Sequence, residues 1–214
     1  MKVCIPTSYS LELAEETGLH IGDGSMNYYQ GRGLYSLRGH KTDDRPFYID
    51  YVSNLYQNVY GVRISLREWK DVFGFQITSS ELVKFKNEEL GLPLGKKTKI
   101  RIPEPFIENE KLAARCLKGI FDTDVNIYYE NKYGRLYPRI EINTVSEILA
   151  GQIVSILKGF GFPSIGIWKV SYNHPTWNPI YRICTRGWDS FNVWKEVIGS
   201  SHPKYAVKLL LEAP

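Results

Sequence analysis

Two stretches of the sequence, 101 residues apart, decide the fold. Residues 11–24 read LELAEETGLHIGDG, and residues 112–125 read LAARCLKGIFDTDV. When the two are aligned, Gly18 falls on Gly119, and several neighbouring positions correspond as well. Similarity of a sequence to itself at a fixed spacing is typical of a repeated structural unit. The sequence therefore predicts one unit that is used twice in a single chain.

The segments after each stretch follow the same order in both halves. β-branched and aromatic residues in partial alternation predict strand pairs at residues 26–41, 62–78, 125–143 and 164–187. An amphipathic helix follows the first pair of each half, and another helix ends each half. Because hairpins rather than β-α-β crossovers join the strands, we expect antiparallel sheets and an α+β fold.

Each half thus has the predicted order α-β-β-α-β-β-α, and a pseudo-twofold axis should relate the two. We place the first repeat at residues 1–101 and the second at residues 102–214, with a basic linker at about residues 91–103. The 214 residues therefore form one unit twice rather than two unrelated domains.

Small residues indicate how the repeats meet. Gly18 and Gly22 are four residues apart, and the second stretch has small residues at the equivalent spacing. A face of small residues lets two helices approach closely, because no side chains hold the backbones apart. If these helices pack about the pseudo-twofold axis, Asp23 and Asp124 come together at their C-terminal ends.

A carboxylate at a helix C-terminus is disfavoured by roughly 0.3–1 kcal/mol, because that end carries partial negative charge. The placement is explained if a divalent cation lies between the two. Carboxylates and the last helical carbonyls are suitable ligands for Mg²⁺, which stabilises the attacking and leaving oxygens in phosphodiester hydrolysis. We therefore predict a metal site from Asp23, Asp124, Gly22 and Thr123. The alternative is that each aspartate is a solvated residue capping a turn.

Positive charge is concentrated in the predicted strands and linker. Counted with residues 62–70 for the second strand pair, these segments carry +13, whereas the net charge of the whole chain is +4, so the remainder carries −9. A basic stripe on strands is typical of a surface that binds phosphates. The alternative is that these residues protect the sheet edges from pairing.

Composition excludes several classes of protein. With 43% hydrophobic residues, the chain has enough apolar content for a packed core. Cys4, Cys116 and Cys184 are an odd and widely spaced set, which excludes a disulfide framework and a cysteine zinc site and fits a reducing cytosol. No apolar run is long enough to cross a bilayer, and we expect neither a signal peptide nor a membrane partner.

The sequence resembles the LAGLIDADG homing endonucleases over nearly its whole length. Residues 16–24, ETGLHIGDG, are similar to the first signature motif in the G-D-G form common in archaeal members, and residues 117–125, LKGIFDTDV, are similar to the second. The segments at residues 37–44 and 89–97 also resemble this family. The chain departs from the motifs at Val125, where the family often has glycine, and at Glu16 and Thr17, which replace Leu-Ala.

This resemblance implies a monomeric endonuclease that cuts double-stranded DNA at a long, nearly non-palindromic site and leaves short 3′ overhangs. It implies a requirement for Mg²⁺, with Mn²⁺ able to substitute, and a cytoplasmic prokaryotic protein of archaeal type. The acidic pair of the family maps onto Asp23 and Asp124, while Asp122 occupies an acidic position that members keep near the helix interface. Supporting polar or basic residues polarise the attacking water, and the candidates are His40, Lys41, Asn143, Lys97 and Lys99.

A two-stranded β-ribbon fits the DNA major groove, so alternation along the strands predicts which side chains face the bases. The candidates are polar residues opposite the apolar positions: Asn27, Arg32, Arg38, Arg63, Arg67, Gln76, Asn126, Tyr128, Lys132, Arg135, Arg139, Glu141, Lys169, Arg182 and Arg186. The alternative is that half of them touch only phosphate. For the tryptophans of the second half, we expect core and loop packing rather than base stacking: Trp168, Trp177, Trp188 and Trp194.

Two readings without DNA cleavage stay open at this point. One is an RNA maturase that assists intron splicing, and RNA is a partner only under this reading. The other is a DNA-binding regulator that does not cut. The intact pair of Asp23 and Asp124 argues against both, because no binding role needs it.

Overall fold

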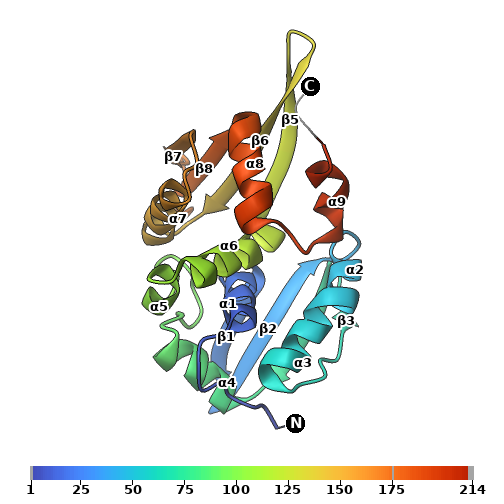
Figure 1. The fold of residues 1–214 in the computed structure, drawn as a ribbon. Coiled ribbons are helices and arrows are strands. Elements are labelled where there is room, and N and C mark those ends of the chain that lie inside the picture. Colours follow the sequence, from blue (N-terminus) through green and yellow to red (C-terminus); the bar gives the residue numbers. More distant parts are fainter. Residues whose placement is uncertain (1, 175, 212–214) are drawn as a thin grey trace.

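The computed structural model describes residues 2–174 and 176–211 and contains two halves of matching order (Figure 1). The elements of the first half are α1 (Leu11–Asp23), β1 (Gly24–Tyr29), β2 (Arg32–His40), α2 (Arg45–Phe47), the π-helical turn η1 (Tyr48–Val52), α3 (Ser53–Tyr60), β3 (Arg67–Glu68), β4 (Val72–Thr78), α4 (Ser80–Lys84) and the π-helical turn η2 (Phe85–Glu89).

The second half begins with the short helix α5 (Glu104–Ile107) and then repeats this order. Its other elements are α6 (Glu110–Asp124), β5 (Val125–Lys132), β6 (Arg135–Thr144), α7 (Glu147–Gly159), β7 (Ile165–Val170), β8 (Ile180–Arg186), α8 (Gly187–Val193), the π-helical turn η3 (Trp194–Ile198) and α9 (Pro203–Leu209).

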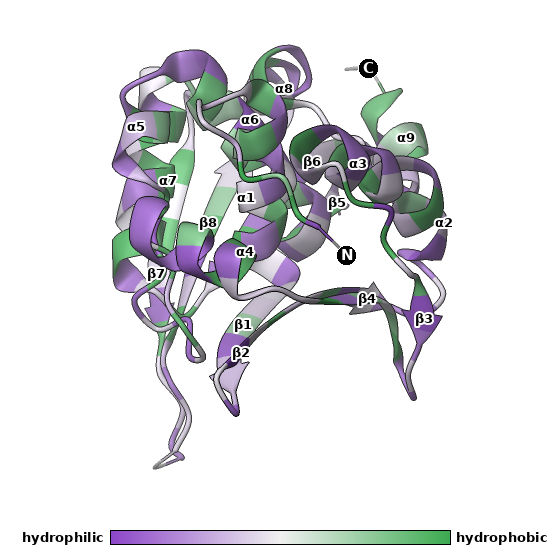
Figure 2. Ribbon diagram, turned by 90° about the horizontal axis from the view of Figure 1, so that it is seen from below, coloured by the Kyte–Doolittle hydropathy of each residue, from purple (hydrophilic) through white to green (hydrophobic). Residues whose placement is uncertain are grey.

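Each half forms one four-stranded sheet with antiparallel pairing throughout. The strand orders are β1-β2-β4-β3 and β5-β6-β8-β7, so the same connections occur twice. Figure 2 shows the helices gathered on one side of the two curved sheets, with the strand hairpins projecting away from them. The predicted α+β fold of two pseudo-symmetric repeats is confirmed.

Helices α1 and α6 pack against each other at the centre of the molecule, between the two halves (Figure 1). Each begins at a residue whose side chain caps the first turn: Ser10 Oγ accepts from the Leu13 amide at 3.1 Å, and Asn109 Oδ1 accepts from the Leu112 amide at 3.2 Å. A Cβ on Gly119 would lie 2.1 Å from the Glu15 carbonyl oxygen. The predicted close approach of the two motif helices is therefore confirmed.

The departure from the motif at Glu16 is accommodated by a buried polar cluster inside the first half. Lys86 Nζ lies 2.6 Å from Glu16 Oε2, and both side chains are fully buried. The hydroxyls of Tyr35, Tyr56 and Tyr60 also donate to this carboxylate. An isolated charge would be very costly there, so the lysine and the tyrosines are what allow a glutamate at this position.

The prediction of a strand from residue 62 is wrong for the first part of that segment. Only Arg67 and Glu68 pair with β4, and residues 62–66 lie outside the ladder. Val62 is buried, whereas Arg63 and Ser65 are exposed. The alternation that predicted a strand therefore reflects burial of one side of an unpaired segment.

The tryptophans divide into two groups. Trp194 is buried and packs on Phe121, and Trp188 is partly buried, as the packing prediction requires. Trp168 and Trp177, however, are 42% and 61% exposed. Trp177 packs on Tyr172 in the loop between β7 and β8, with ring centroids 5.2 Å apart, as loop packing requires, whereas Trp168 in β7 lies outside the core. Within the ranges that the structure describes, no helix has the length and apolar content needed to cross a membrane.

Candidate active site at the contact of the two repeats

The two predicted aspartates end the two central helices. Asp23 is the last residue of α1 and Asp124 the last residue of α6, and each is followed directly by a strand. A Cβ on Gly22 would lie 1.8 Å from Thr123 Oγ1 and 3.2 Å from Asp124 Oδ2. The helix ends are thus in contact, and the structure brings the predicted carboxylates to one place.

Their position at the contact of the two helix ends makes both carboxylates hard to ionise. Burial raises the pKa of Asp23 to about 7, and repulsion from Asp124 and Asp44 adds to the rise. Although the Asp124 side chain is open to solvent on one side, the protein around it raises its pKa to about 6. Bringing two such groups together costs folding free energy, which a cation between them would offset.

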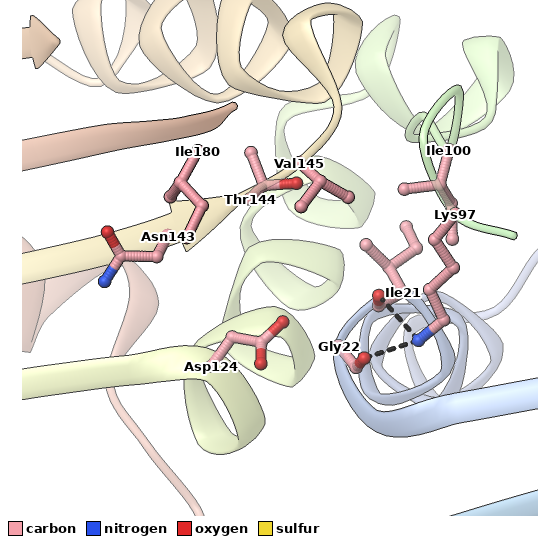
Figure 3. A pocket seen from close by; sticks show the side chains of 9 residues that line it. All are labelled: Ile21, Gly22, Lys97, Ile100, Asp124, Asn143, Thr144, Val145 and Ile180. Carbon is pink, nitrogen blue, oxygen red and sulfur yellow. Dashed lines mark hydrogen bonds between the residues drawn. The ribbon is translucent and has the colours of Figure 1, made fainter. Parts of the chain in front are cut away.

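Lys97 supplies one positive charge to this place. Its Nζ donates to the carbonyl oxygens of Ile21 at 3.2 Å and of Gly22 (Figure 3), and also to that of His20 at 3.1 Å, at the negative end of α1. The predicted linker is ordered here, because Ile100 is buried and the Ile102 amide donates to Gln152 Oε1 at 2.8 Å.

Lys204 supplies a second positive charge, and sequence reasoning missed it. It lies in α9, which Figure 1 shows beside α2 of the first half. Its Nζ is 3.4 Å from Asp44 Oδ1, and its charge lowers the pKa of both Asp23 and Asp124, as that of Lys97 does. A signal was available in the chain order, because Lys97 comes after η2 in the first half and Lys204 comes after η3 in the second.

The other predicted supporting residues differ in position. Asn143 lines the same pocket as Gly22, Lys97 and Asp124 (Figure 3). His40 instead pairs with Asp43 at 3.4 Å.

Lys41 pairs with Glu68 at 2.9 Å. The ladder register, in which Gly24 faces Leu37 and Val125 faces Ile142, makes Arg38 the counterpart of Asn143 in the first half. Arg38 lies over the Trp69 ring, with its guanidinium carbon 4.2 Å from the ring centroid.

The donor set at the helix ends consists of oxygens, which suits Mg²⁺ or Mn²⁺. Asp23 and Asp124 provide the carboxylates. Thr123 Oγ1 donates to the Ile120 carbonyl at 2.8 Å, and the backbone carbonyl of Thr123 is the group predicted to face a cation. Residues 2–174 and 176–211 contain no group of three or more His, Cys, Asp or Glu side chains arranged to hold a metal. Two carboxylates fit an ion that keeps waters and takes substrate phosphate oxygens.

The predicted DNA-facing residues of the second sheet form a connected polar surface. Glu141 Oε1 lies 3.2 Å from Arg182 Nε and accepts from Asn143 Nδ2 at 3.4 Å. Arg139 pairs with Glu130 at 2.6 Å. The arginines are therefore held by acidic neighbours on the same face.

Burial separates the predicted DNA-facing set into two groups. The exposed members are Arg32, Arg63, Arg67, Gln76, Asn126, Lys132, Arg135, Lys169, Arg182 and Arg186. The partly buried members are Asn27, Arg38, Tyr128, Arg139 and Glu141. The predicted alternation holds in the second part of β6, where Ile140 and Ile142 are buried while Asn143 is exposed, but not at Leu136, which is exposed. Sequence reasoning missed Trp168, whose ring lies 5.0 Å from the Arg186 guanidinium on this surface.

Comparison with known proteins gives no match by sequence and clear matches by structure. No model of a known protein family and no curated protein sequence matches the chain. The homing endonuclease I-DmoI in complex with DNA and Mn aligns with a TM-score of 0.62 at 15% identity, over 90% of this chain and 98% of that one.

Two further solved structures agree. The homing endonuclease I-WcaI bound to its DNA recognition sequence aligns with a TM-score of 0.62 at 16% identity, over 97% of this chain and 90% of that one. The LAGLIDADG meganuclease I-AabMI bound to uncleaved DNA aligns with a TM-score of 0.55 at 12% identity, over 94% and 88%. Likeness at these identities shows a shared fold.

Proposed function

Because the chain has the fold of the LAGLIDADG homing endonucleases, we propose that it is a site-specific, metal-dependent endonuclease that cuts double-stranded DNA. The observation that carries the proposal is the contact of the two helix ends, which presents Asp23 and Asp124 together. Both carboxylates come from one chain, so a monomer supplies the complete pair.

The acidic pair and the helix-end carbonyls of Gly22 and Thr123 are the groups that would hold Mg²⁺, with Mn²⁺ as a substitute, and the Gly22 carbonyl would exchange its contact with Lys97 Nζ for the ion. When bound, such an ion stabilises the attacking and leaving oxygens of a phosphodiester. Three further side chains of the chain would assist at the reacting phosphates. Lys97 and Lys204 place positive charge beside the carboxylates, where the scissile phosphates would lie, and Asn143 orients a water.

The two sheets are the proposed DNA-binding saddle. Residues 1–101 and 102–214 would each read one half of a long, nearly non-palindromic site, because the two sheets present different side chains. Arginine pairs bidentately with guanine and glutamate accepts from cytosine, each worth about 1–3 kcal/mol of discrimination. Arg182 and Glu141 are the candidates that the structure holds next to each other.

The experiment is a selection followed by a cleavage assay. The purified protein is incubated with randomised double-stranded DNA in Ca²⁺, bound DNA is recovered and sequenced, and the consensus is tested with Mg²⁺. We expect cleavage of both strands by the wild type and no cleavage by Asp23→Asn. Selective binding without cleavage would indicate a regulator, and retention of structured RNA in place of DNA would indicate a maturase.

A further inference from the structure

A short segment of the second half crosses onto the first half. Residues 199–202 connect η3 to α9 and lie over the contact of the two repeats, where buried carboxylates of both halves bind them. We call residues 199–202 the strap. We propose that the strap is a positioning device that holds Lys204 beside the acidic pair, with Asp44 and His202 as positioning residues. This inference rests on the proposed endonuclease function.

Asp122 and Glu15 anchor the first part of the strap. Ser200 Oγ donates to Asp122 Oδ1, and the Ser201 amide donates to Asp122 Oδ2 at 3.0 Å. Ser201 Oγ donates to Glu15 Oε1 at 3.4 Å. Glu15 belongs to α1 and Asp122 to α6, so the strap is bound to both central helices.

His202 anchors the second part. Its Nδ1 accepts from the Lys204 amide at 3.1 Å and caps α9, so its Nε2 carries the proton that is donated to Asp44 Oδ1 at 2.9 Å. The His202 side chain is fully buried and stacks on Phe47, with ring centroids 4.5 Å apart. The histidine therefore has one orientation and one hydrogen-bonding pattern.

Asp44 is the point on the first half that receives both groups. Its Oδ2 accepts from the His40 amide at 2.6 Å, which fixes the carboxylate at the start of α2. Its Oδ1 then accepts from His202 Nε2 and from Lys204 Nζ at 3.4 Å. Among the ion pairs of the described residues, Asp44 is the acidic partner of Lys204.

Helix α9 is also fixed along the start of β5. The Tyr205 hydroxyl donates to the carbonyl of Val125, the residue after Asp124, and Lys208 Nζ donates to the Ile127 carbonyl. Lys204 is thus held between the strap on one side and β5, the strand that follows α6, on the other. These contacts fix α9, although much of it is exposed, and so fix the position of the Lys204 ammonium group.

Lys97 provides an internal reference for this device. It comes after η2 in the first half, as Lys204 comes after η3 in the second, but it is held by the carbonyls of α1 and not by Asp44. If each lysine serves one DNA strand, loss of the Asp44 contact should slow the strand that depends on Lys204 and spare the other.

The test measures single-turnover nicking of each strand of a supercoiled plasmid that carries the selected target. Lys204→Met and Asp44→Asn should slow the same strand by about tenfold to a hundredfold, while DNA binding changes less than threefold. The double variant should be no slower than Lys204→Met alone, because Asp44 acts through that lysine. His202→Gln, which keeps a donor toward Asp44, should retain more of the rate than His202→Leu.

Thermal unfolding is measured for each variant whose cleavage rate is compared. If Asp44→Asn does not fold, the comparison of His202→Gln with His202→Leu tests the positioning role. If Asp44→Asn slows the cleavage of both strands equally, or if the double variant is slower than Lys204→Met by the further factor seen for Asp44→Asn, the positioning role is overturned. The proposed endonuclease function would still stand. If the wild type cuts neither strand, the proposed function fails and this inference fails with it. If the wild type cuts both strands and Lys204→Met cuts them at the same rate, only the positioning inference is overturned.

Discussion

A Cβ on Gly18 would lie 2.9 Å from the Cα of Gly119 and 2.0 Å from the Cys116 carbonyl oxygen. The two central helices are therefore in backbone contact, and this contact sets the separation of the carboxylates at their ends. Gly18→Ala should destabilise the protein by roughly 1–3 kcal/mol or more, because rigid backbone cannot yield to the added methyl group.

Gly151→Ala is the matched control for this change. Gly151 also lies within a helix, α7, but a Cβ there meets no atom within 4 Å. Alanine should stabilise that helix by roughly 0.8–1 kcal/mol. Denaturant unfolding of the two variants measures both effects, and equal stability of Gly18→Ala and the wild type would contradict the close packing.

The sequence allowed prediction of the repeats, the central helix contact and most strands, because these depend on local periodicity and on spacing within one motif. It could not provide the surroundings of Asp44, whose partners His202 and Lys204 are about 160 residues away. Nor did composition show that Glu16 is buried with Lys86, since two charged residues 70 positions apart look like surface residues.

The pKa of Asp23 leads to a prediction about stability and pH. Because the folded-state pKa is raised from 3.8 to about 7, the folded protein holds this proton more tightly than the unfolded chain does. Stability is therefore highest below pH 4 with respect to this group and is lost as pH rises through 7. Asp23→Asn should raise the unfolding temperature at pH 8, at roughly 2–4 °C per kcal/mol, and should have little effect at pH 4.

Calorimetry without added metal, at both pH values, checks this prediction. A destabilised Asp23→Asn protein at pH 8 would show that the carboxylate stabilises the fold and is not under electrostatic strain. Asp43→Asn is a suitable control, because Asp43 is exposed and its ion pair, among the residues that the structure describes, is with His40 at the surface.

The buried pair of Glu16 and Lys86 should behave differently from a surface ion pair. Lys86→Met leaves an unpaired carboxylate in the core and should cost about 3–5 kcal/mol. The double change Glu16→Leu with Lys86→Met removes both charges and should be less destabilising than the single change. Urea unfolding of the three proteins tests this order, and a double variant that is the least stable would contradict it.

DNA affinity should depend strongly on salt if the saddle binds phosphates. Each phosphate contact releases counterions and contributes a slope of roughly −0.9 to a plot of log K against log salt concentration. Arg32→Ala, on the exposed strand surface, should make this slope shallower, whereas Lys158→Ala, at the end of α7, should not. Titrations at several salt concentrations measure both slopes, and an affinity independent of salt would contradict the assignment of the surface.

The central claim is that Asp23 and Asp124 together form a metal-dependent centre for DNA cleavage. Its most direct test compares the wild type, Asp23→Asn and Asp124→Asn on the selected target DNA with Mg²⁺, with binding measured separately in Ca²⁺. We expect the wild type to cut both strands, and each variant to bind the DNA with affinity close to wild type and to cut neither strand. Cleavage at the wild-type rate by either single variant would contradict the claim.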